Sequence, residues 1–321
     1  MKDPYDIIRE WKTRRGEHFA LATLVHVEGS SYRRPGARML ICEDGTMVGS
    51  LSAGCIEEEV ALRAIEVLRT GEPTLMRFDT RRRFGCAGKI DILVERADDR
   101  FFSDLERDLT ARRAHVAVTR FFENEFVQQI NPAIRCLIVG DGLDNAPLHS
   151  LGELLGWDVI EIADPRTISV TPDDWTAAIV KSHNYGRDLV ALQKLLPLNL
   201  RYVGLIGPRK RRDQLLNDLL EVGVTINAGF FAPAGLDLGA ESPQEIALAI
   251  ISEIQRVFAY GSGLSLRERK IPIHVPRLQS TRAKLRLQGG RRRRRDQSFN
   301  PVEQPKGNAA GSFDSASHPS G

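Results

Sequence analysis

The feature that most constrains the fold is an alternation of short apolar strands with helices in the second half of the chain. Residues 135–139 read Arg-Cys-Leu-Ile-Val, a run typical of a buried strand, and Gly140 follows it. Further runs of this kind lie at 158–162, 177–180 and 202–206. The last helix of the pattern, 243–257, opens with a capping box of Ser242 and Glu245. Strands that alternate with helices predict an open, largely parallel α/β sheet.

The first half of the chain has a different pattern, dominated by short strands. Runs rich in β-forming residues predict strands at 19–27, 38–42, 47–51, 74–78 and 90–94. Helical spacing predicts one clear helix over 55–69, which Gly71 and Pro73 end. We therefore expect an N-terminal β-rich α+β domain before the parallel-sheet domain. The expected segments are 1–97 for the N-terminal domain, 98–131 for a connecting region with a helical stretch and a strand at 115–119, 132–273 for the parallel-sheet domain and 274–321 for a disordered tail.

The basic character of the chain belongs to its tail. From 276 to 321 there are ten Lys or Arg and three Asp or Glu, a net charge of +7. Since the whole chain carries +3, residues 1–275 carry −4. The folded body therefore has no net positive charge that would predict specific nucleic-acid binding. The tail is basic and then rich in Gly, Ser and Asn, which predicts disorder.

Other compositional features narrow the class of protein. No apolar run approaches the length of a membrane span, and residues 1–11 lack the apolar core of a signal peptide. We therefore expect a cytoplasmic protein with no membrane span. The four cysteines are too few and too scattered for a disulfide framework, and none is spaced as a zinc-binding pair. They are Cys42, Cys55, Cys86 and Cys136.

Cys55 stands where a small-residue turn leads into the predicted helix, and Glu57 follows two residues later. Helix N-termini present free backbone N–H groups and a partial positive charge. A thiol placed there is a good nucleophile or metal ligand, although the neighbouring glutamates oppose this effect. The alternative is that Cys55 is a small buried hydrophobic residue, which is the usual role of a free cysteine.

A glycine turn follows the first strand of the second domain. It reads Gly140-Asp-Gly142-Leu-Asp-Asn145, and Asp164 lies at the end of the next strand, where a ribose-binding acid belongs in a dinucleotide site. The second domain is thus of Rossmann type. However, Asn145 replaces the third glycine, and Asp141 adds negative charge where a pyrophosphate would bind. The turn therefore indicates either a dinucleotide site or a Rossmann-type sheet kept for its architecture.

Two further groups are expected at the carboxyl edge of the parallel sheet. Gly207 ends a strand and is followed by four cations, Arg209 to Arg212. Such a cluster suits a phosphate-bearing ligand, whereas the alternative is a solvated helix face. His183 follows the strand at 177–180 and would lie at the same edge, with either a structural or a functional role.

Arginines flank both cysteine-bearing loops of the first domain. Arg33, Arg34 and Arg38 precede Cys55, and Arg81 to Arg83 precede Cys86. If the two cysteines converge, guanidinium groups would surround a thiol pair. That combination suits a soft metal or sulfur centre attached to an anionic organic cofactor. The rival interpretation is a redox disulfide, which needs only the two cysteines.

Several segments, in order along the chain, resemble the XdhC/CoxI family, the accessory proteins of xanthine and carbon monoxide dehydrogenases. The resemblance covers about residues 8 to 260. Its segments are Arg-Arg-Pro-Gly-Ala at 33–37, Gly-Ser-Leu-Ser-Ala-Gly-Cys-Ile-Glu at 49–57, Phe-Gly-Cys-Ala-Gly at 84–88, Tyr-Val-Gly-Leu-Ile-Gly at 202–207 and Gly-Leu-Asp-Leu-Gly-Ala at 235–240.

The resemblance implies a molybdenum cofactor maturation chaperone. Such a protein binds molybdopterin or its dinucleotide form, assists sulfuration by a cysteine desulfurase and inserts the cofactor into the large subunit of a xanthine or CO dehydrogenase-type molybdoenzyme. It is expected to be a homodimer and an accessory protein more than an enzyme. The expected catalytic residues are Cys55, Glu57 and Cys86, with Cys55 also as metal ligand. The expected cofactor-binding residues are Arg33, Arg34, Gly54, Gly140, Gly142, Asp164, His183, Gly207, Arg209 and Asp237.

Three features depart from the family pattern, the arginine-rich tail among them, and two alternative functions stay open. The glycine turn has Leu143 and Asn145 where the family usually has a histidine and a small residue, and the second cysteine segment reads Cys-Ala-Gly in place of Cys-Gly-Gly. The first alternative is an NAD(P)-dependent oxidoreductase that uses the Rossmann-type domain. The second is a protein-interaction scaffold whose cysteines only pack.

Overall fold

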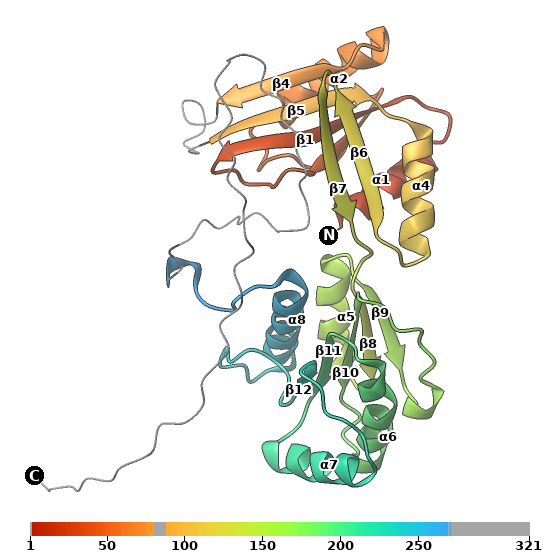
Figure 1. Cartoon of the computed structure of the whole chain (residues 1–321), viewed down its shortest axis with the longest axis vertical. Coiled ribbons are helices and arrows are strands. Elements are labelled where there is room, and N and C mark those ends of the chain that lie inside the picture. The colour runs from red at the N-terminus through yellow and green to blue at the C-terminus, as the bar shows by residue number, and fades with distance from the viewer. Residues whose placement is uncertain (1, 80–87, 269, 271–321) are drawn as a thin grey trace, which may run out of the picture. The chain divides into compact units, whose positions relative to one another are not determined.

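The computed structural model describes residues 2–79, 88–268 and 270 of the chain. Its described part contains an antiparallel and a parallel sheet of five strands each, and a two-stranded hairpin (Figure 1). This matches the expected α/β fold class. The expected tail, 274–321, and the loop around Cys86 lie outside the described residues.

The antiparallel sheet occupies the first part of the chain, with strand order β3-β2-β1-β5-β4. Its strands are β1 (Phe19–Gly29), β2 (Arg38–Cys42), β3 (Met47–Gly49), β4 (Thr74–Asp79) and β5 (Gly88–Arg96). All four pairings are antiparallel. The predicted strands are present, and β2 has the predicted bounds. The expected strand at 47–51 ends earlier, at Gly49, whose backbone has a φ of +90°.

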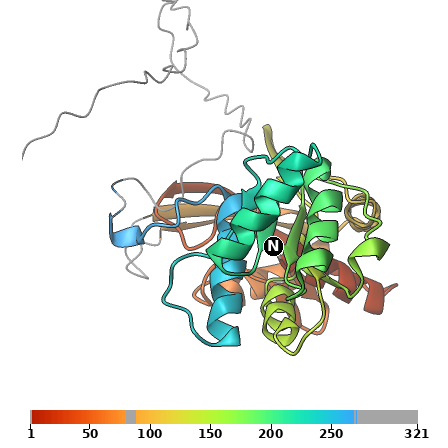
Figure 2. The same ribbon diagram turned by 90° about the horizontal axis from the view of Figure 1, so that it is seen from below.

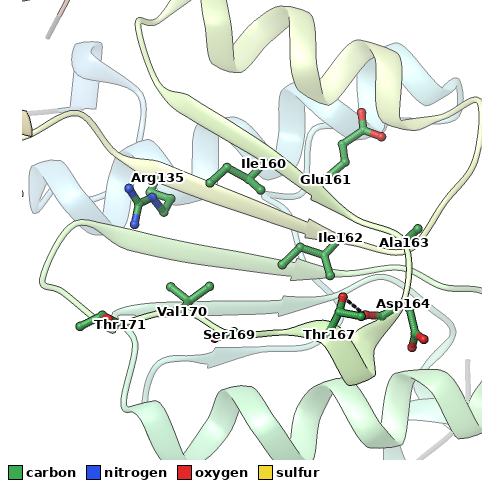
Figure 3. A pocket seen from close by; sticks show the side chains of 10 residues that line it. All are labelled: Arg135, Ile160, Glu161, Ile162, Ala163, Asp164, Thr167, Ser169, Val170 and Thr171. Atoms are coloured by element: carbon green, nitrogen blue, oxygen red, sulfur yellow. Dashed lines mark hydrogen bonds between the residues drawn. The ribbon is translucent and has the colours of Figure 1, made fainter.

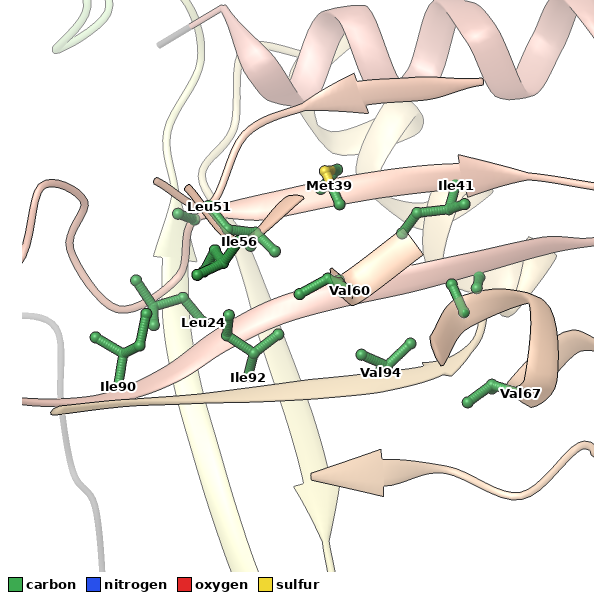
Figure 4. Close-up of a cluster of buried hydrophobic side chains, with 14 of the residues drawn as sticks. Leu24, Met39, Ile41, Leu51, Ile56, Val60, Val67, Ile90, Ile92 and Val94 are labelled. Atoms are coloured by element: carbon green, nitrogen blue, oxygen red, sulfur yellow. The ribbon is translucent and has the colours of Figure 1, made fainter. Parts of the chain in front are cut away.

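Helix α2 (Glu57–Thr70) covers one face of this sheet. Val60, Ala64 and Val67 recur at helical spacing and are fully buried against alternate residues of the strands, such as Leu24 and Ile92 (Figure 4). Gly71 ends the helix in the left-handed conformation, with a φ of +78°. The helix begins two residues later than predicted.

The remaining elements of the first half bury the other face of the sheet. They are α1 (Asp3–Thr13), α4 (Asp99–Thr110), β6 (His115–Phe121) and β7 (Asn124–Ile130). Trp11 of α1 stacks on Phe102 of α4 with ring centroids 5.4 Å apart, and its indole N–H donates to Asp99 at 2.7 Å. The stretch expected to connect two domains is therefore folded itself, as a helix and a hairpin.

The second sheet is parallel throughout, with strand order β12-β11-β10-β8-β9. Its strands are β8 (Arg135–Val139), β9 (Asp158–Ile162), β10 (Thr176–Val180), β11 (Tyr202–Leu205) and β12 (Phe230–Phe231). In chain order this is 2-1-3-4-5, so the direction of strand addition reverses between β8 and β10. Open parallel sheets bind ligands at such a switch point, beyond the carboxyl ends of the strands.

Helices cover both faces of the parallel sheet (Figures 1 and 2). Alternate strand residues face opposite ways: Leu137 packs with α6 (Tyr185–Leu195) and α7 (Arg209–Glu221), whereas Ile138 packs with α5 (Asn145–Leu154) and α8 (Pro243–Ala259). The predicted capping box of α8 is present, because Ser242 accepts from the N–H of Glu245 and the Glu245 carboxylate accepts from that of Ser242. Within the described residues, no helix has the length and apolarity that crossing a bilayer requires.

Candidate functional site

The loop that carries Cys55 is held by the side chain of Glu57, the first residue of α2. Glu57 is 9% exposed. Its carboxylate accepts hydrogen bonds from the backbone N–H groups of Leu51 (3.1 Å), Ser52 (2.7 Å) and Ile56 (3.2 Å). The Ser52 hydroxyl also donates to it, at 2.6 Å. Four donors from the preceding turn thus converge on one carboxylate.

These hydrogen bonds set the protonation state of Glu57. Burial by itself would raise the pKa of Glu57, but the Ser52 hydroxyl and the backbone donors favour the ionised form more strongly, so the pKa lies below its usual value. A carboxylate that is ionised and bonded to four donors is poorly suited to transfer protons. Glu57, which the sequence places among the catalytic residues, is positioned here to fix the loop.

Ser52 continues this arrangement toward the thiol. Its hydroxyl oxygen accepts from the N–H groups of Gly54 (3.2 Å) and Cys55 (3.1 Å). These bonds hold both residues in a turn, which is why the helix begins after Cys55 and not at it. Gly54 has a φ of +102°, a conformation that favours glycine, and it faces open space. Cys55 is exposed, so its thiol lies at the surface of a fixed turn.

The arginine-bearing loop contacts the segment that leads to Cys55. The Arg33 guanidinium donates to the Ser50 hydroxyl at 2.6 Å and to the carboxylate of Asp3. Arg34 is exposed. The structure therefore brings Arg33 to the strand end that precedes the cysteine turn, as a site beside Cys55 requires.

Arg38, the third arginine of that region, has a different place. It is buried, donates to the Gly36 carbonyl at 3.2 Å and to the Gln128 side chain, and lies over the ring of Phe101 at 5.5 Å. Burial lowers the pKa of Arg38 to about 10, and the charge of Glu95 opposes this shift. Arg38 thus belongs to the interior, and it does not line the surface around Cys55.

Of the other three cysteines, two are buried and the third lies outside the described residues. Cys42 and Cys136 are buried in strands, and burial raises their pKa values to about 11 and about 12. Cys86 and the arginines Arg81 to Arg83 lie outside the described residues. The convergence of Cys55 with Cys86 therefore stays a prediction.

The second group of expected residues lies at the switch point of the parallel sheet. Gly140 and Gly142 have φ values of +126° and +151°. A Cβ on Gly140 would come within 2.8 Å of the Lys181 carbonyl group, and one on Gly142 would lie 3.4 Å from the Lys181 Nζ. Glycine is required here because the turn after β8 packs directly on the end of β10.

Lys181 is the residue at this site that sequence reasoning missed. Its side chain is 0% exposed, and its ammonium donates to Asp144 Oδ1 at 2.6 Å and to the side-chain oxygen of Asn145. The other carboxylate oxygen of Asp144 lies 3.4 Å from His183 Nε2. The one available signal was a lysine directly after an apolar strand, whose side chain must either leave the core or find an anion within it.

Asn145 has a structural reason to replace the third glycine. Its side-chain N–H₂ donates to the Gly140 carbonyl at 3.0 Å and to the Glu161 carboxylate at 3.1 Å, while its oxygen accepts from Lys181. Both polar atoms of this buried amide therefore have hydrogen-bond partners. An asparagine in place of the third glycine thus links the glycine turn to Lys181 through hydrogen bonds.

A buried carboxylate also fixes the neighbouring turn. Asp188 is fully buried and accepts from the Ser182 N–H (3.0 Å) and hydroxyl (2.5 Å), and it pairs with Arg211. Arg211, one of the four cations expected at the sheet edge, thus points toward the interior. His183 lies within this turn with a φ of +54°, which is uncommon for a residue other than glycine.

Of the remaining expected residues, Asp164 and Gly207 follow strands of the parallel sheet and lie at its carboxyl edge. Asp164 caps the short helix η1 (Pro165–Thr167), accepting from the Arg166 N–H at 2.9 Å and pairing with its guanidinium at 2.9 Å, which lowers the pKa of Asp164. Gly207 follows β11 and precedes the exposed Arg209 at the start of α7. Asp237 is exposed in the segment between β12 and α8.

An open hollow of about 750 Å³ runs along the edge strand β9 (Figure 3). Asp164 is the expected site residue among those that line it. Its lining residues are Arg135, Ile160, Glu161, Ile162, Ala163, Asp164, Thr167, Ser169, Val170 and Thr171. Within the described residues, no group of three His, Cys, Asp or Glu side chains is arranged to hold a metal ion.

Two family models match the chain. The model of the XdhC and CoxI family matches residues 13–79, and that of the XdhC Rossmann domain matches residues 136–254. The first match contains Cys55 and its loop, and the second contains the switch point.

Relatives and solved structures agree with these matches. The chain is 29% identical to a probable xanthine dehydrogenase subunit of Bacillus subtilis, over 74% of this chain and 92% of that protein. It is 26% identical to the molybdenum cofactor insertion chaperone PaoD of Escherichia coli, over 75% of this chain and 84% of that protein. A crystal structure described as a xanthine dehydrogenase from Bacillus halodurans has the same fold, with a TM-score of 0.69, 23% identity, and coverage of 81% of this chain and 96% of that one.

Proposed function

Because the chain belongs to the XdhC and CoxI family, we propose that it binds the molybdenum cofactor and delivers it to a molybdoenzyme of the xanthine dehydrogenase type. The names of two relatives support a role in molybdenum cofactor maturation, since one is an insertion chaperone for this cofactor and the other is named for xanthine dehydrogenase. Assistance to sulfuration, with a cysteine desulfurase as sulfur donor, and a homodimeric state belong to the same proposal.

The observation that carries the proposal is the exposed thiol of Cys55 on a loop fixed by Glu57. Thiolates are the soft ligands that bind transition metals such as molybdenum or carry sulfur. The bound cofactor supplies a metal centre and an anionic phosphate. The residues of the loop fit such a group in kind, because they offer a thiol and, at the preceding strand end, a guanidinium.

In this proposal each residue has a defined task. Cys55 contacts the metal or sulfur end of the cofactor, and Ser52 and Glu57 keep the thiol in place. Arg33 stabilises the anionic part, because guanidinium groups bind phosphate through paired N–H donors. Arg33 holds Asp3 and Ser50 in the described structure, so phosphate binding would replace one of these partners. Arg34 and Cys86 stay candidate contacts.

The test is to compare single cysteine variants after co-expression with the cofactor pathway. We expect Cys55→Ser to remain folded and to lose most bound molybdenum and pterin, and with them the activation of an apo-dehydrogenase. Cys42→Ser, at a buried position, is the control: it should bind the cofactor in proportion to the fraction that is folded. A folded Cys55→Ser variant that keeps molybdenum and activates the dehydrogenase as the parent does would overturn the role of Cys55.

A further inference from the structure

Two side chains at the switch point converge on the carboxylate of Asp144. Lys181 Nζ lies 2.6 Å from one oxygen and His183 Nε2 lies 3.4 Å from the other. Asp144 is the N-cap residue of α5, yet its side chain makes no capping hydrogen bond to that helix. An N-cap aspartate usually makes one. The carboxylate is therefore bonded to residues that follow β10 and not to α5.

The same arrangement suits a phosphate. A glycine turn after the first strand, the N-terminus of the following helix and a nearby cation are what bind phosphate in sheets of this kind. Here the carboxylate already fills that space. A Cβ added to Gly142 would lie 2.5 Å from Asp144 Oδ1 and 3.4 Å from Lys181 Nζ, so the turn, the carboxylate and the ammonium share one small volume.

We propose that Asp144 is a specificity-determining residue, whose tethered carboxylate occupies the place of a ligand phosphate and excludes diphosphate-bearing nucleotides from the switch point. Asp141, in the same turn, is by contrast exposed and pairs with the Arg187 guanidinium at 3.2 Å. The buried ammonium and the neighbouring guanidinium are thus each paired with an aspartate. An entering diphosphate therefore finds the buried ammonium already neutralised by the Asp144 carboxylate, which lies where its own phosphate would have to bind.

The proposal is tested by removing the charge that holds this side chain on Lys181, so that a neutral side chain can yield its place to a phosphate. Asp144→Asn should bind inorganic pyrophosphate and ADP at least tenfold more tightly than the parent, about 1.4 kcal/mol, in titration calorimetry at constant ionic strength. Asp141→Asn is the matched control. It makes the same change of net charge in the same turn, at a side chain that is 67% exposed and does not contact Lys181. Its affinities should stay within about threefold of the parent.

Two further variants separate the proposal from a loss of folding and from a general charge effect. Asp144→Ser keeps a good N-cap residue and should show the same gain if Asp144→Asn does not fold. Lys181→Met, added to the Asp144→Asn variant, should abolish the gain while thermal unfolding confirms a folded protein. The proposal is overturned if folded Asp144 variants bind no more tightly than the parent, or if Asp141→Asn gains as much. Parent binding as tight as that of the variants also overturns it.

Discussion

Replacing Glu57 by glutamine should release the loop that carries Cys55. The change keeps the size of the side chain but turns one carboxylate oxygen into an N–H₂ group. Each carboxylate oxygen accepts two hydrogen bonds from the loop, so the glutamine keeps one pair of acceptor bonds and loses the other. The N–H₂ group would then face donors, the backbone N–H of Ile56 among them.

The size of the effect follows from these contacts. Hydrogen bonds to a charged group are worth about 1.5–3 kcal/mol each, and an unsatisfied buried N–H costs about 1–3 kcal/mol. Part of the loss is recovered because the Ser52 hydroxyl can rotate to accept from the new amide in place of one of the two backbone N–H groups that it now binds. We therefore expect Glu57→Gln to lower the free energy of unfolding by about 2–4 kcal/mol.

Urea unfolding measures this loss, and the rate of Cys55 alkylation under native conditions reports how far the loop has loosened. Glu58→Gln is the matched control, since Glu58 is the next residue and is exposed. An exposed substitution should change stability by less than about 0.5 kcal/mol. If Glu57→Gln unfolds at the same urea concentration as Glu58→Gln, the carboxylate does not hold the loop and the reasoning fails.

The pH dependence gives an independent check on the same group. The pKa of Glu57 is lowered in the folded protein, so its stabilising effect is complete above the unfolded pKa and is lost as pH falls through the folded pKa. The stability difference between the parent and Glu57→Gln should therefore be constant at neutral pH. It should shrink as pH falls below about 4.3, the ordinary pKa of a glutamate. A difference that does not change down to pH 3 would contradict the role of the charge.

Three further predictions concern other parts of the chain. Gly140→Ala should cost more than about 2 kcal/mol in chemical unfolding, because its Cβ would lie 2.8 Å from backbone atoms. Gly186→Ala should cost nothing or stabilise α6, because its Cβ would make only an ordinary contact, 3.7 Å from Asn184 Oδ1. Cys136→Ser should lower the melting temperature, since it puts a hydroxyl into a fully buried apolar site, and Cys55→Ser should not. Truncation after residue 275 should leave the melting temperature unchanged and reduce nonspecific retention on nucleic acid, because a chain of that composition cannot form a packed core; a large loss of stability would show that the tail contacts the body.

Local patterns predicted much of the fold. The bounds of β9 follow from its apolar run, and the start of α8 follows from the capping box of Ser242 and Glu245. In contrast, the sequence did not predict α1, because its apolar residues are few among many charges. Their role is seen only in the fold, where Trp11 stacks on Phe102. Ile7, Ile8 and Trp11 do recur at helical spacing, but so few apolar residues among many charges do not by themselves distinguish a buried helix face.

The candidate site was likewise predictable only in part. The sequence placed Cys55 at the first residue of a helix and left open whether its thiol is buried, whereas the structure places it in the turn before that helix, exposed. The roles of Glu57 and Lys181 could not be derived, since each depends on which way a charged side chain turns. Glu57 turns back toward its own loop, and Lys181 turns into the core because Asp144 and Asn145 are there to receive its charge.

The contact between Asp3 and Arg33 has a practical consequence for handling the protein. Asp3 is the first residue of α1, and its carboxylate pairs with the guanidinium that also contacts Ser50. An affinity tag fused directly before Asp3 adds flexible chain beside that guanidinium, and an acidic or histidine-rich tag would compete for it. Purification and cofactor-loading experiments should therefore keep such a tag away from Asp3 and its contact with Arg33.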